Sequence, residues 1–503
     1  MKMVTHFVNG TAWSGVSERT ANIYNPSTGK IVGEVALASK ADVDNVVDIA
    51  YEAFQSWSTT PPAKRAQIMF NFRDLLRKNI DELAELLSSE HGKTLPDAKG
   101  EIDRGIEVIE FACGIPHLLK GEYSEQVARG VDTYSIRQPL GVIAGITPFN
   151  FPAMVPLWMY PVSLACGNSF ILKPSERDPS VVMRIAELLD EAGLPKGVFS
   201  VVNGDKEAVD ALLDNPKVDA ASFVGSTTIG HYIYSRGTNN GKRIQALCGA
   251  KNHLVVMPDA DMNQVADALM GSSYGSAGER CMAISVAVPV GAETADKLIE
   301  ALKGRVAALK VAPYTDPTSD MGPVITQQSL DKINNYIAEG VEKGATLVVD
   351  GRGLKVKGHE EGYFIGGCLF DNVTTDMSIY TDEIFGPVLS VVRANSYEEA
   401  VQMINDHEYG NGTAIFTRDG DTARDFTSRI KVGMVGVNVP IPVPVAYHSF
   451  GGWKRSLFGD HHIHGMEGVR FNTHLKAITE RWPSGIKEGA VFNFHSGSET
   501  DNK

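Results

Sequence analysis

Apolar residues recur along the chain at the spacing of helix faces. Between residues 42 and 57 they include Val43, Val46, Val47, Ala50 and Phe54, which would line one side of a helix. The same reasoning predicts further helices at 61–87, 97–119, 179–192, 206–213, 293–309, 327–343 and 398–405. The segments between these helices decide the fold class.

Short apolar runs lie between the helices and predict strands. They occupy 141–148, 169–172, 199–202, 220–224, 282–288, 346–349, 389–393 and 413–416. Strands that alternate with helices are typical of a doubly wound parallel sheet. One alternating block precedes Cys281 and a second follows it. We therefore expect an α/β fold with two doubly wound domains.

Three stretches stand apart from this pattern. Residues 121–137 are polar and alternating, like an excursion between two larger blocks, and 471–481 return to strand-like alternation. The most apolar run, 151–172, is interrupted by three prolines and a Gly-Asn pair. A membrane-spanning helix needs ~20 continuous apolar residues, so we expect this run to be a buried core segment.

Composition narrows the class of protein. A chain of 503 residues predicts two or three domains, and its net charge of −14 argues against nucleic acid or an anionic membrane as partner. Residues 1–10 lack the apolar segment of a secretory signal. The five cysteines are Cys113, Cys166, Cys248, Cys281 and Cys368. They form no CxxC pair, so we expect a reduced cytoplasmic protein without disulfides or zinc.

Cys281 ends a stretch in which glycine and serine predominate. From residue 271 to Arg280 most side chains are small, and a strand-like alternation begins at Met282. Small residues let other groups approach closely, and an adjacent arginine favours the thiolate, which is the nucleophilic form of cysteine. The motif alone leaves open a buried structural cysteine.

Polar residues follow several of the predicted strands. The turn 225–230 precedes a helix and suits a phosphate, with a plain strand-to-helix turn as the alternative. Lys173 and Glu176 follow another strand. A carboxylate there can bind a ribose diol and repels a 2′-phosphate, which favours NAD over NADP; a solvated loop is the alternative.

Three further features are candidates for chemistry. Asn150 follows a predicted strand, where its amide can serve an oxyanion hole or simply form a turn. Arg104 lies on a predicted helix near Glu101 and Glu107, which also fits a surface ion pair. Histidines at 461, 462 and 464 have no second ligand cluster, so we expect no metal site.

Five motifs together resemble the aldehyde dehydrogenase superfamily over nearly the whole chain. They are Thr-Pro-Phe-Asn-Phe-Pro at 147–152, Lys-Pro-Ser-Glu at 173–176, Phe-Val-Gly-Ser at 223–226, Gly-Glu-Arg-Cys at 278–281 and Glu-Ile-Phe-Gly-Pro-Val at 383–388. The resemblance implies that Cys281 is the nucleophile and that Asn150, with the Cys281 amide, holds the oxyanion. For NAD it implies Lys173 and Glu176 at the adenosine ribose, Ser226 at the pyrophosphate, and Glu383 with Phe385 at the nicotinamide ribose. Thr147, Phe149, Arg177, Gly225 and Cys248 complete the cofactor residues that we expect.

One departure from the family pattern changes the expected chemistry. Where the family usually has Glu-Leu-Gly-Gly-Lys, this chain has Leu-Cys-Gly-Ala-Lys at 247–251, so Leu247 replaces the glutamate that activates water. Cys248 in this segment could instead belong to the core. The motifs at 249–253, 256–260 and 280–283 resemble the methylmalonate-semialdehyde dehydrogenases, a CoA-acylating branch in which two arginines hold the substrate carboxylate. Arg104 and Arg280 match those arginines.

The resemblance implies a function and its alternatives. We expect NAD-dependent, CoA-acylating oxidative decarboxylation of methylmalonate or malonate semialdehyde to propionyl-CoA or acetyl-CoA, through a thioester on Cys281. The preferred semialdehyde stays open. A hydrolytic aldehyde dehydrogenase that uses another base is the alternative, and a non-catalytic protein that keeps the fold is a third.

The resemblance also implies a domain organisation. We expect an NAD-binding domain from 1–120 and 140–248, a catalytic domain from 249–445, and a small β arm from 121–139 and 470–490. In the family this arm bridges subunits, which implies a homodimer or homotetramer.

Overall fold

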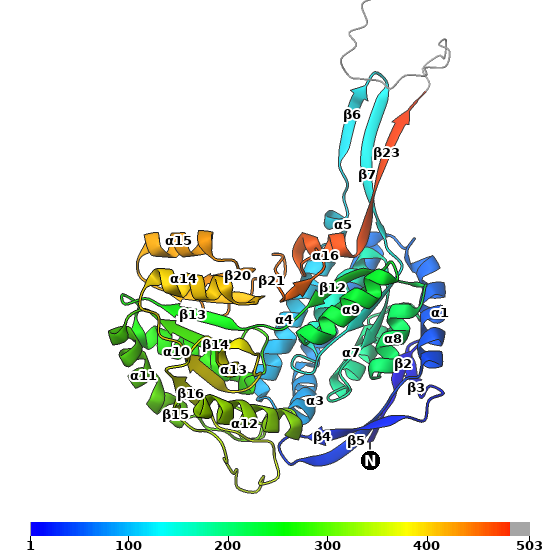
Figure 1. Ribbon diagram of the computed structural model, residues 1–503. Helices are drawn as coiled ribbons and strands as arrows, with labels where there is room; N and C mark the ends of the chain where they lie inside the picture. Colours follow the sequence, from blue (N-terminus) through cyan, green and yellow to red (C-terminus); the bar gives the residue numbers. More distant parts are fainter. Residues whose placement is uncertain (1, 483–503) are drawn as a thin grey trace, which may run out of the picture.

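The computed structural model describes residues 2–482 and consists of two sheet-centred bodies and a projecting arm (Figure 1). The first sheet has the strand order β22-β12-β11-β8-β9-β10-β2-β3. Its strands are β2 His6–Val8, β3 Thr11–Trp13, β8 Val142–Ile146, β9 Ser169–Lys173, β10 Phe199–Val201, β11 Val218–Val224, β12 Arg243–Leu247 and β22 Leu457–Phe458. The five strands from β12 to β10 are parallel. β8 and β9 are buried along their whole length, because helices cover both faces.

In the part of the chain that the structure describes, helices α1 to α9 accompany this sheet. They are α1 Lys40–Trp57, α2 Pro62–Lys78, α3 Ile80–His91, α4 Leu95–Cys113, α5 Ile115–Leu118, α6 Met154–Cys166, α7 Ser180–Glu191, α8 Lys206–Asp214 and α9 Thr227–Asn239. Two expected helices are each divided. The first breaks at Asn79, and the second breaks at Gly114, just before a proline that has no N–H to continue a helix.

The second sheet has the order β15-β16-β17-β14-β13-β19-β20, and only β15 runs antiparallel to its neighbour. Its strands are β13 Asn252–Val256, β14 Ile284–Pro289, β15 Thr346–Val349, β16 Cys368–Asp371, β17 Val388–Val391, β19 Gly412–Phe416 and β20 Met434–Val437. Its helices are α10 Met262–Tyr274, α11 Ala292–Ala307, α12 Gln327–Glu342, α13 Ser378–Thr381, α14 Tyr397–Asp406 and α15 Gly420–Arg429. The two sheets confirm the expected α/β class with two doubly wound bodies.

The apolar run 151–172 forms helix α6 and strand β9. Every residue of α6 is buried, and Gly167 ends the helix with a φ of +104°. The run thus lies in the core, as expected. Across residues 2–482, no helix combines the length and the apolar character that crossing a bilayer requires.

Smaller sheets complete the described chain. A three-stranded sheet at the N-terminal end contains β1 Lys2–Val4, β5 Lys30–Ala36 and β4 Thr20–Asn25. β18 Tyr409–Gly410 pairs with β21 Trp453–Lys454, and α16 Gly465–Phe471 follows. The arm is a sheet of β6 Tyr123–Ala128, β7 Val131–Pro139 and β23 Thr473–Arg481, which rises from the body (Figure 1). Of the arm that we expected, residues 483–490 lie outside the described residues.

The order of the parallel strands determines where polar side chains gather. β12, β11, β8 and β9 are neighbours, so their carboxyl ends share one edge of the first sheet. Residues 147–150, 225–226 and 174–177 follow three of these ends. In open α/β sheets this edge is where ligands bind, so the described fold brings the candidate residues of the first body to one edge.

Candidate functional site

The loop before Cys281 adopts a conformation that is unusual for its residues. Between α10 and β14, Ser276 and Ala277 both have a φ of +53°. Side-chain-bearing residues in such sparsely populated regions cost about 1 to 3 kcal/mol each. Gly278 follows, and a Cβ there would lie 2.2 Å from the carbonyl oxygen of Gly386. Glycine thus lets the cysteine loop touch the loop that carries Glu383 and Phe385.

The main chain at Cys281 is fixed by two asparagines from other segments. Asn252 Nδ2 donates to the Cys281 carbonyl at 2.9 Å, and Asn411 Nδ2 donates to the same oxygen at 3.2 Å. Asn252 begins strand β13, beside β14 in the second sheet. Sequence reasoning quoted Asn252 within a motif and gave it no role. The two amides hold the cysteine backbone rigidly, which a nucleophile requires.

A small cavity joins the cysteine to the residues expected at the nicotinamide. It has a volume of about 20 Å³, and Arg280, Cys281, Glu383 and Phe385 are among the residues that line it. Phe385 has a φ of +60°, a genuine outlier for a bulky side chain. The structure therefore brings together four of the predicted site residues. Arg280 and Cys281 are adjacent in the chain, and Glu383 and Phe385 follow about a hundred positions later.

The Cys281 thiol is protonated in the ligand-free protein. Burial and the nearby Glu383 carboxylate raise the pKa of Cys281 to about 12, against a smaller opposing effect of Arg280. Arg280 does favour the thiolate, as expected, but burial and Glu383 outweigh its effect in the ligand-free protein. The Arg280 guanidinium forms an ion pair with Asp97 at 2.7 Å. The Glu383 carboxylate, by contrast, raises the pKa of the thiol. Residue Cys281 as a whole is half-buried.

Asn150 lies at the expected position beyond β8 and is 4% exposed. Phe151, the next residue, packs against the same apolar cluster as Cys281. The main-chain carbonyl of Asn150 accepts a hydrogen bond from Lys93 Nζ at 2.7 Å. This contact does not use the side-chain amide of Asn150. The placement suits an amide that stabilises an oxyanion.

The ribose-binding residues expected after β9 form a connected group. Lys173 Nζ donates to the Gly204 carbonyl at 2.9 Å and lies 3.4 Å from Glu176 Oε2. Lys173 is buried, whereas 37% of the Glu176 side chain is exposed, so the carboxylate can accept from a diol. Thr147 is buried next to them along the sheet edge, and its hydroxyl has no hydrogen-bond partner in residues 2–482.

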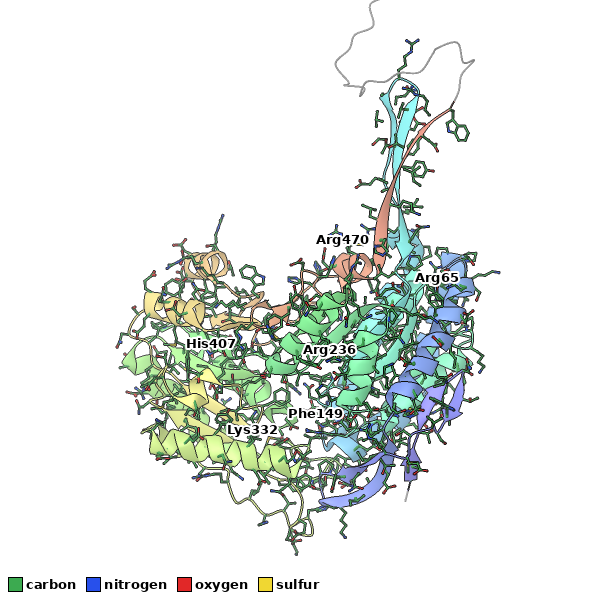
Figure 2. The ribbon with its side chains drawn as sticks, turned by 45° about the vertical axis from the view of Figure 1, so that its right-hand side comes forward. Arg65, Phe149, Arg236, Lys332, His407 and Arg470 are labelled. Carbon is green, nitrogen blue, oxygen red and sulfur yellow. The ribbon has the colours of Figure 1, made fainter. Side chains whose placement is uncertain are left out.

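Aromatic contacts connect the first body to the loop of Glu383. The Phe149 ring lies edge-on to the Phe385 ring with centroids 5.8 Å apart, and the Arg177 guanidinium lies 5.2 Å from the centroid of Phe149. Phe149 is found where the two sheet-centred bodies approach each other (Figure 2). Three residues that we expected in the cofactor site therefore pack against one another.

Helix α9 begins directly after the turn of Gly225 and Ser226. Ser226 occupies the N-cap position without a side-chain hydrogen bond to the helix, and the Gly225 amide donates to the Leu247 carbonyl at 3.1 Å. Such an uncapped end attracts anions. A Cβ on Gly230 in this helix would meet the Cys248 sulfur at 2.2 Å. Cys248 is 6% exposed and packs beneath α9, which favours the core alternative; its contact with cofactor stays a prediction.

The two candidate clamp arginines are both associated with helix α4. Arg280 pairs with Asp97, and Arg104, seven residues further along α4, pairs with Glu107 at 2.8 Å and donates to the Pro444 carbonyl at 2.9 Å. At ~1.5 Å per residue, positions 97 and 104 lie about 10 Å apart, two turns along one face. Glu101 does not pair with Arg104; it pairs with Lys93.

Leu247 contributes only apolar surface at the place of the expected base. Its side chain packs against the cluster that also contacts Cys281 and Phe151. The carboxylate whose charge acts on the thiol is Glu383, and Glu383 Oε1 accepts from the Ala250 amide at 3.0 Å. Sequence reasoning missed Glu279, which is fully buried with Oε2 unpartnered in residues 2–482; burial raises the pKa of Glu279 to about 8.

The three histidines do not form a common ligand set. His461 Nδ1 lies 3.2 Å from Glu467, whereas His464 is buried between Trp158 and Phe450, with ring centroids 5.2 and 4.7 Å away. Burial and the charge of Arg104 lower the pKa of His464 to about 3, so this ring is neutral. Within residues 2–482, no group of three His, Cys, Asp or Glu side chains is arranged to hold a metal.

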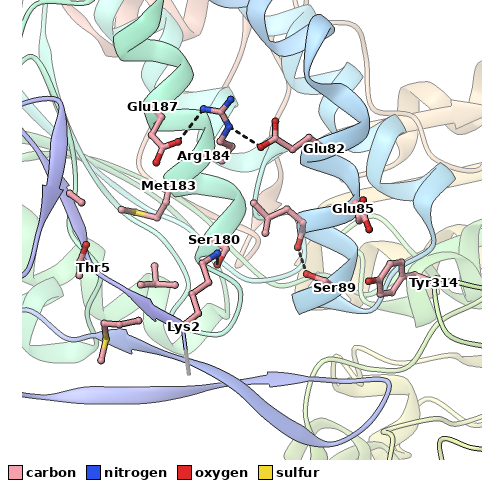
Figure 3. A pocket seen from close by; sticks show the side chains of 14 residues that line it. Lys2, Thr5, Glu82, Glu85, Ser89, Ser180, Met183, Arg184, Glu187 and Tyr314 are labelled. Carbon is pink, nitrogen blue, oxygen red and sulfur yellow. Dashed lines mark hydrogen bonds and ion pairs between the residues drawn. The ribbon is translucent and has the colours of Figure 1, made fainter.

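A larger cavity lies away from these residues. It has a volume of about 610 Å³ between β1, α3 and α7, and Lys2, Glu82, Arg184 and Tyr314 are among its lining side chains (Figure 3). None of the predicted site residues lines it. Four of the predicted site residues instead line the smaller cavity at Cys281.

Fold and site define a class of protein: two doubly wound bodies with a cysteine loop facing a sheet edge of the dinucleotide-binding type. Comparison with known proteins gives the family. The sequence model of the aldehyde dehydrogenase family matches residues 13–478, and the chain belongs to that family. The expected resemblance is confirmed.

Comparison with individual relatives points to a narrower group within the family. The chain is 60% identical over 497 residues to a malonate-semialdehyde dehydrogenase of Pseudomonas aeruginosa. The aligned region covers 99% of this chain and 100% of that protein. A Sinorhizobium meliloti structure in complex with NAD, provisionally assigned as a methylmalonate-semialdehyde dehydrogenase, has a TM-score of 0.96 and 60% identity over 97% of this chain and 99% of that one. The methylmalonate-semialdehyde dehydrogenase of Oceanimonas doudoroffii has a TM-score of 0.95 and 56% identity over 96% and 99%.

Proposed function

We propose that this protein catalyses NAD-dependent, CoA-acylating oxidative decarboxylation of malonate semialdehyde or methylmalonate semialdehyde. The observation that carries the proposal is the environment of Cys281. A cysteine faces Glu383 and Phe385 across a small cavity, and Leu247 provides apolar surface where the family has its water-activating glutamate. The names of the relatives supply the substrate class.

The chain's own residues account for the first bond-forming step. The Cys281 sulfur, once deprotonated, attacks the aldehyde carbon, and the carbonyl oxygen becomes an alkoxide. The Asn150 amide and the Cys281 main-chain N–H donate to that oxygen, and such donors are worth roughly a hundredfold or more in rate. Bound NAD would supply the acceptor for the hydride that leaves this carbon, and the acyl group would then remain on Cys281 as a thioester.

The positions of four residues support NAD as the cofactor. The exposed carboxylate of Glu176 suits the adenosine ribose, the uncapped end of α9 at Ser226 suits the pyrophosphate, and Glu383 with Phe385 borders the cysteine cavity. The Glu176 carboxylate also disfavours a 2′-phosphate. One related structure contains NAD. These four residues are the contacts that we propose for NAD.

The proposed route of acyl release depends on position 247, where this chain has a leucine in place of the water-activating glutamate. The thioester carbonyl accepts the electron pair of the breaking carbon–carboxylate bond, carbon dioxide leaves, and the α-carbon then takes a proton. No carboxylate stands at Leu247 to deprotonate water. A CoA thiolate is already a strong nucleophile and depends less on a base, so it attacks the thioester and releases acyl-CoA and the Cys281 thiolate.

Two arginines would select the carboxylated aldehyde. Arg280 adjoins the nucleophile, and Arg104 lies on the same face of α4 as the Asp97 that binds Arg280. Arginine is well suited to binding a carboxylate through two parallel hydrogen bonds. We propose that the substrate carboxylate lies between these two guanidinium groups.

The arm supports a further part of the proposal, a homo-oligomer in the cytoplasm. Tyr123, Val127, Leu475 and Trp482 are large apolar side chains on or beside the arm, and between half and three quarters of each is exposed. A second copy of the chain would cover this surface. Light scattering behind size-exclusion chromatography should give a dimer or tetramer, and a monomer would contradict this part.

One assay tests the proposed reaction. NADH formation is followed with NAD and each semialdehyde, with and without CoA, and the products are separated by chromatography. We expect acyl-CoA and carbon dioxide when CoA is present, and no more than one turnover per Cys281 without CoA. Steady NADH formation without CoA, with release of a free acid, would establish the hydrolytic alternative.

A further inference from the structure

A buried ion pair lies directly behind the segment that carries Asn150. Lys93 Nζ and Glu101 Oε2 are 2.6 Å apart, and their side chains are 1% and 0% exposed. Lys93 is in the short connection between α3 and α4, and Glu101 is on α4. Neither residue belongs to the set that we assign to substrate or NAD.

The contacts of this pair converge on residues 150–154. Lys93 Nζ donates to the Asn150 carbonyl at 2.7 Å and lies 4.5 Å from the centroid of the Phe151 ring. Glu101 Oε1 accepts from the amides of Ala153 and Met154, at 2.8 and 3.1 Å. Helix α6 begins at Met154 without a side-chain cap from its N-cap residue, so Glu101 fulfils that role from another helix.

Stability alone does not explain a charged pair at this depth. Removing two charges from water costs several kcal/mol per ion, and apolar replacements of buried pairs are often neutral or stabilising. What this pair supplies is direction, because its three hydrogen bonds to this segment all fall on main-chain groups, at Asn150, Ala153 and Met154. A catalytic amide must be held to within about 0.5 Å by such a supporting shell.

We infer that Lys93 is a positioning residue that, with Glu101, aims the Asn150 amide at the reacting oxygen. The inference rests on the proposed function, in which Asn150 is an oxyanion donor. The Lys93 contact uses the main-chain carbonyl, so it fixes the residue and leaves both amide N–H groups for the alkoxide. Loss of the pair lets the amide drift while the cofactor residues after β9 and β11 keep their own contacts.

The test is a double-mutant cycle with Lys93→Met, Asn150→Ala and the combined variant. The readout is the single-turnover rate of NADH formation, with NAD affinity and thermal midpoint measured alongside. We expect Lys93→Met to lower the rate roughly 10- to 100-fold, as a misplacement of about 1 Å does, with NAD affinity within about twofold. In the Asn150→Ala background the same change should lower the rate by no more than about twofold.

Lys242→Met is the matched control. Lys242 is another buried lysine, and its Nζ donates to the carbonyls of Asn215 and Val218 at 2.6 and 2.7 Å, away from Asn150. We expect it to lower the thermal midpoint and to leave the NADH rate within about twofold. If Lys93→Met does not fold, Glu101→Gln keeps the acceptor for the two amides and removes the charge; its rate loss should likewise vanish in the Asn150→Ala background.

The outcomes separate the two ideas. If Asn150→Ala alone leaves the rate unchanged, the oxyanion assignment in the proposed function is wrong. If Asn150→Ala is slow and Lys93→Met slows it further by the full factor, Lys93 does not act through Asn150 and the inference fails. If Lys93→Met and Lys242→Met lower the rate of NADH formation equally, Lys93 has a role in stability only, and the inference is overturned.

Discussion

The ion pair between Arg280 and Asp97 yields a prediction with an unexpected sign. In the ligand-free protein Asp97 already neutralises Arg280 at 2.7 Å, and the two side chains are 21% and 27% exposed. If Arg280 binds the substrate carboxylate, Asp97 competes with the substrate for the same guanidinium. Asp97→Asn should therefore improve the binding of carboxylated aldehydes, whereas Arg280→Leu should weaken it.

The size of the effect follows from the exposure of the pair. Two unit charges 4 Å apart attract by ~4 kcal/mol at an effective dielectric constant of 20 and by ~1 kcal/mol in water. Asp97 lies in the first turn of α4 with access to solvent, so we take the lower figure, about 1 kcal/mol. Since ~1.36 kcal/mol is a factor of ten, the KM for malonate semialdehyde should fall about fivefold.

The assay compares aldehydes with and without a carboxylate. KM values for malonate semialdehyde and propionaldehyde are measured on the unmodified chain, Asp97→Asn and a matched control. Glu110→Gln is that control, because Glu110 lies on the same helix and pairs with a remote arginine, Arg77, at 2.5 Å. Only Asp97→Asn should lower the KM, and only for the carboxylated aldehyde. A higher KM would mean that Asp97 orients Arg280, and equal effects on both aldehydes would remove Arg280 from the clamp.

Three further predictions concern the charges around the nucleophile. Because the pKa of Cys281 is raised to about 12, its alkylation by iodoacetamide should quicken about tenfold per pH unit from pH 7 to 10. Glu383→Gln should speed alkylation throughout, and a plateau near pH 8 in the unmodified chain would contradict the raised pKa. Leu247→Glu should introduce CoA-independent release of free acid at ten times the background or more; products that still require CoA would show that the missing base is not what excludes water. Glu279 has a pKa raised by burial to about 8, so its contribution to folding is fully present below its unfolded pKa and is lost as pH rises through 8. Glu279→Gln should therefore raise the thermal midpoint at pH 9 relative to the unmodified chain and not at pH 5, and a pH-independent difference would refute this.

Local sequence was sufficient for most elements of the fold. The helix expected from the apolar stripe at 42–57 is α1 Lys40–Trp57, and the apolar run at 169–172 is β9 Ser169–Lys173. The stripe of α1 records which side of the helix faces the core, and the continuous apolar run of β9 records burial on both faces; both kinds of information are local. Boundaries were less predictable where one backbone break divided a continuous stripe, as at Asn79 between α2 and α3.

The short motifs were also sufficient for the family, since their order along the chain was enough without any knowledge of contacts. The same motifs could not show the state of the nucleophile. Arg280 adjoins Cys281 in sequence, yet its guanidinium turns to Asp97, while Glu383, a hundred residues later, lies close enough to raise the pKa of the thiol. Electrostatic effects depend on distance and burial, which sequence neighbours do not report.

By itself the sequence determined the alternation of helices and strands and the family, and it predicted Cys281 as the nucleophile, because each of these is written in short-range patterns of residue type. Only the tertiary structure decided which groups surround Cys281. It placed Asn252 and Asn411 on the cysteine carbonyl, Lys93 behind Asn150, and Asp97 on Arg280. These contacts join segments that are far apart along the chain, and they form only when tertiary packing brings those segments within hydrogen-bonding distance.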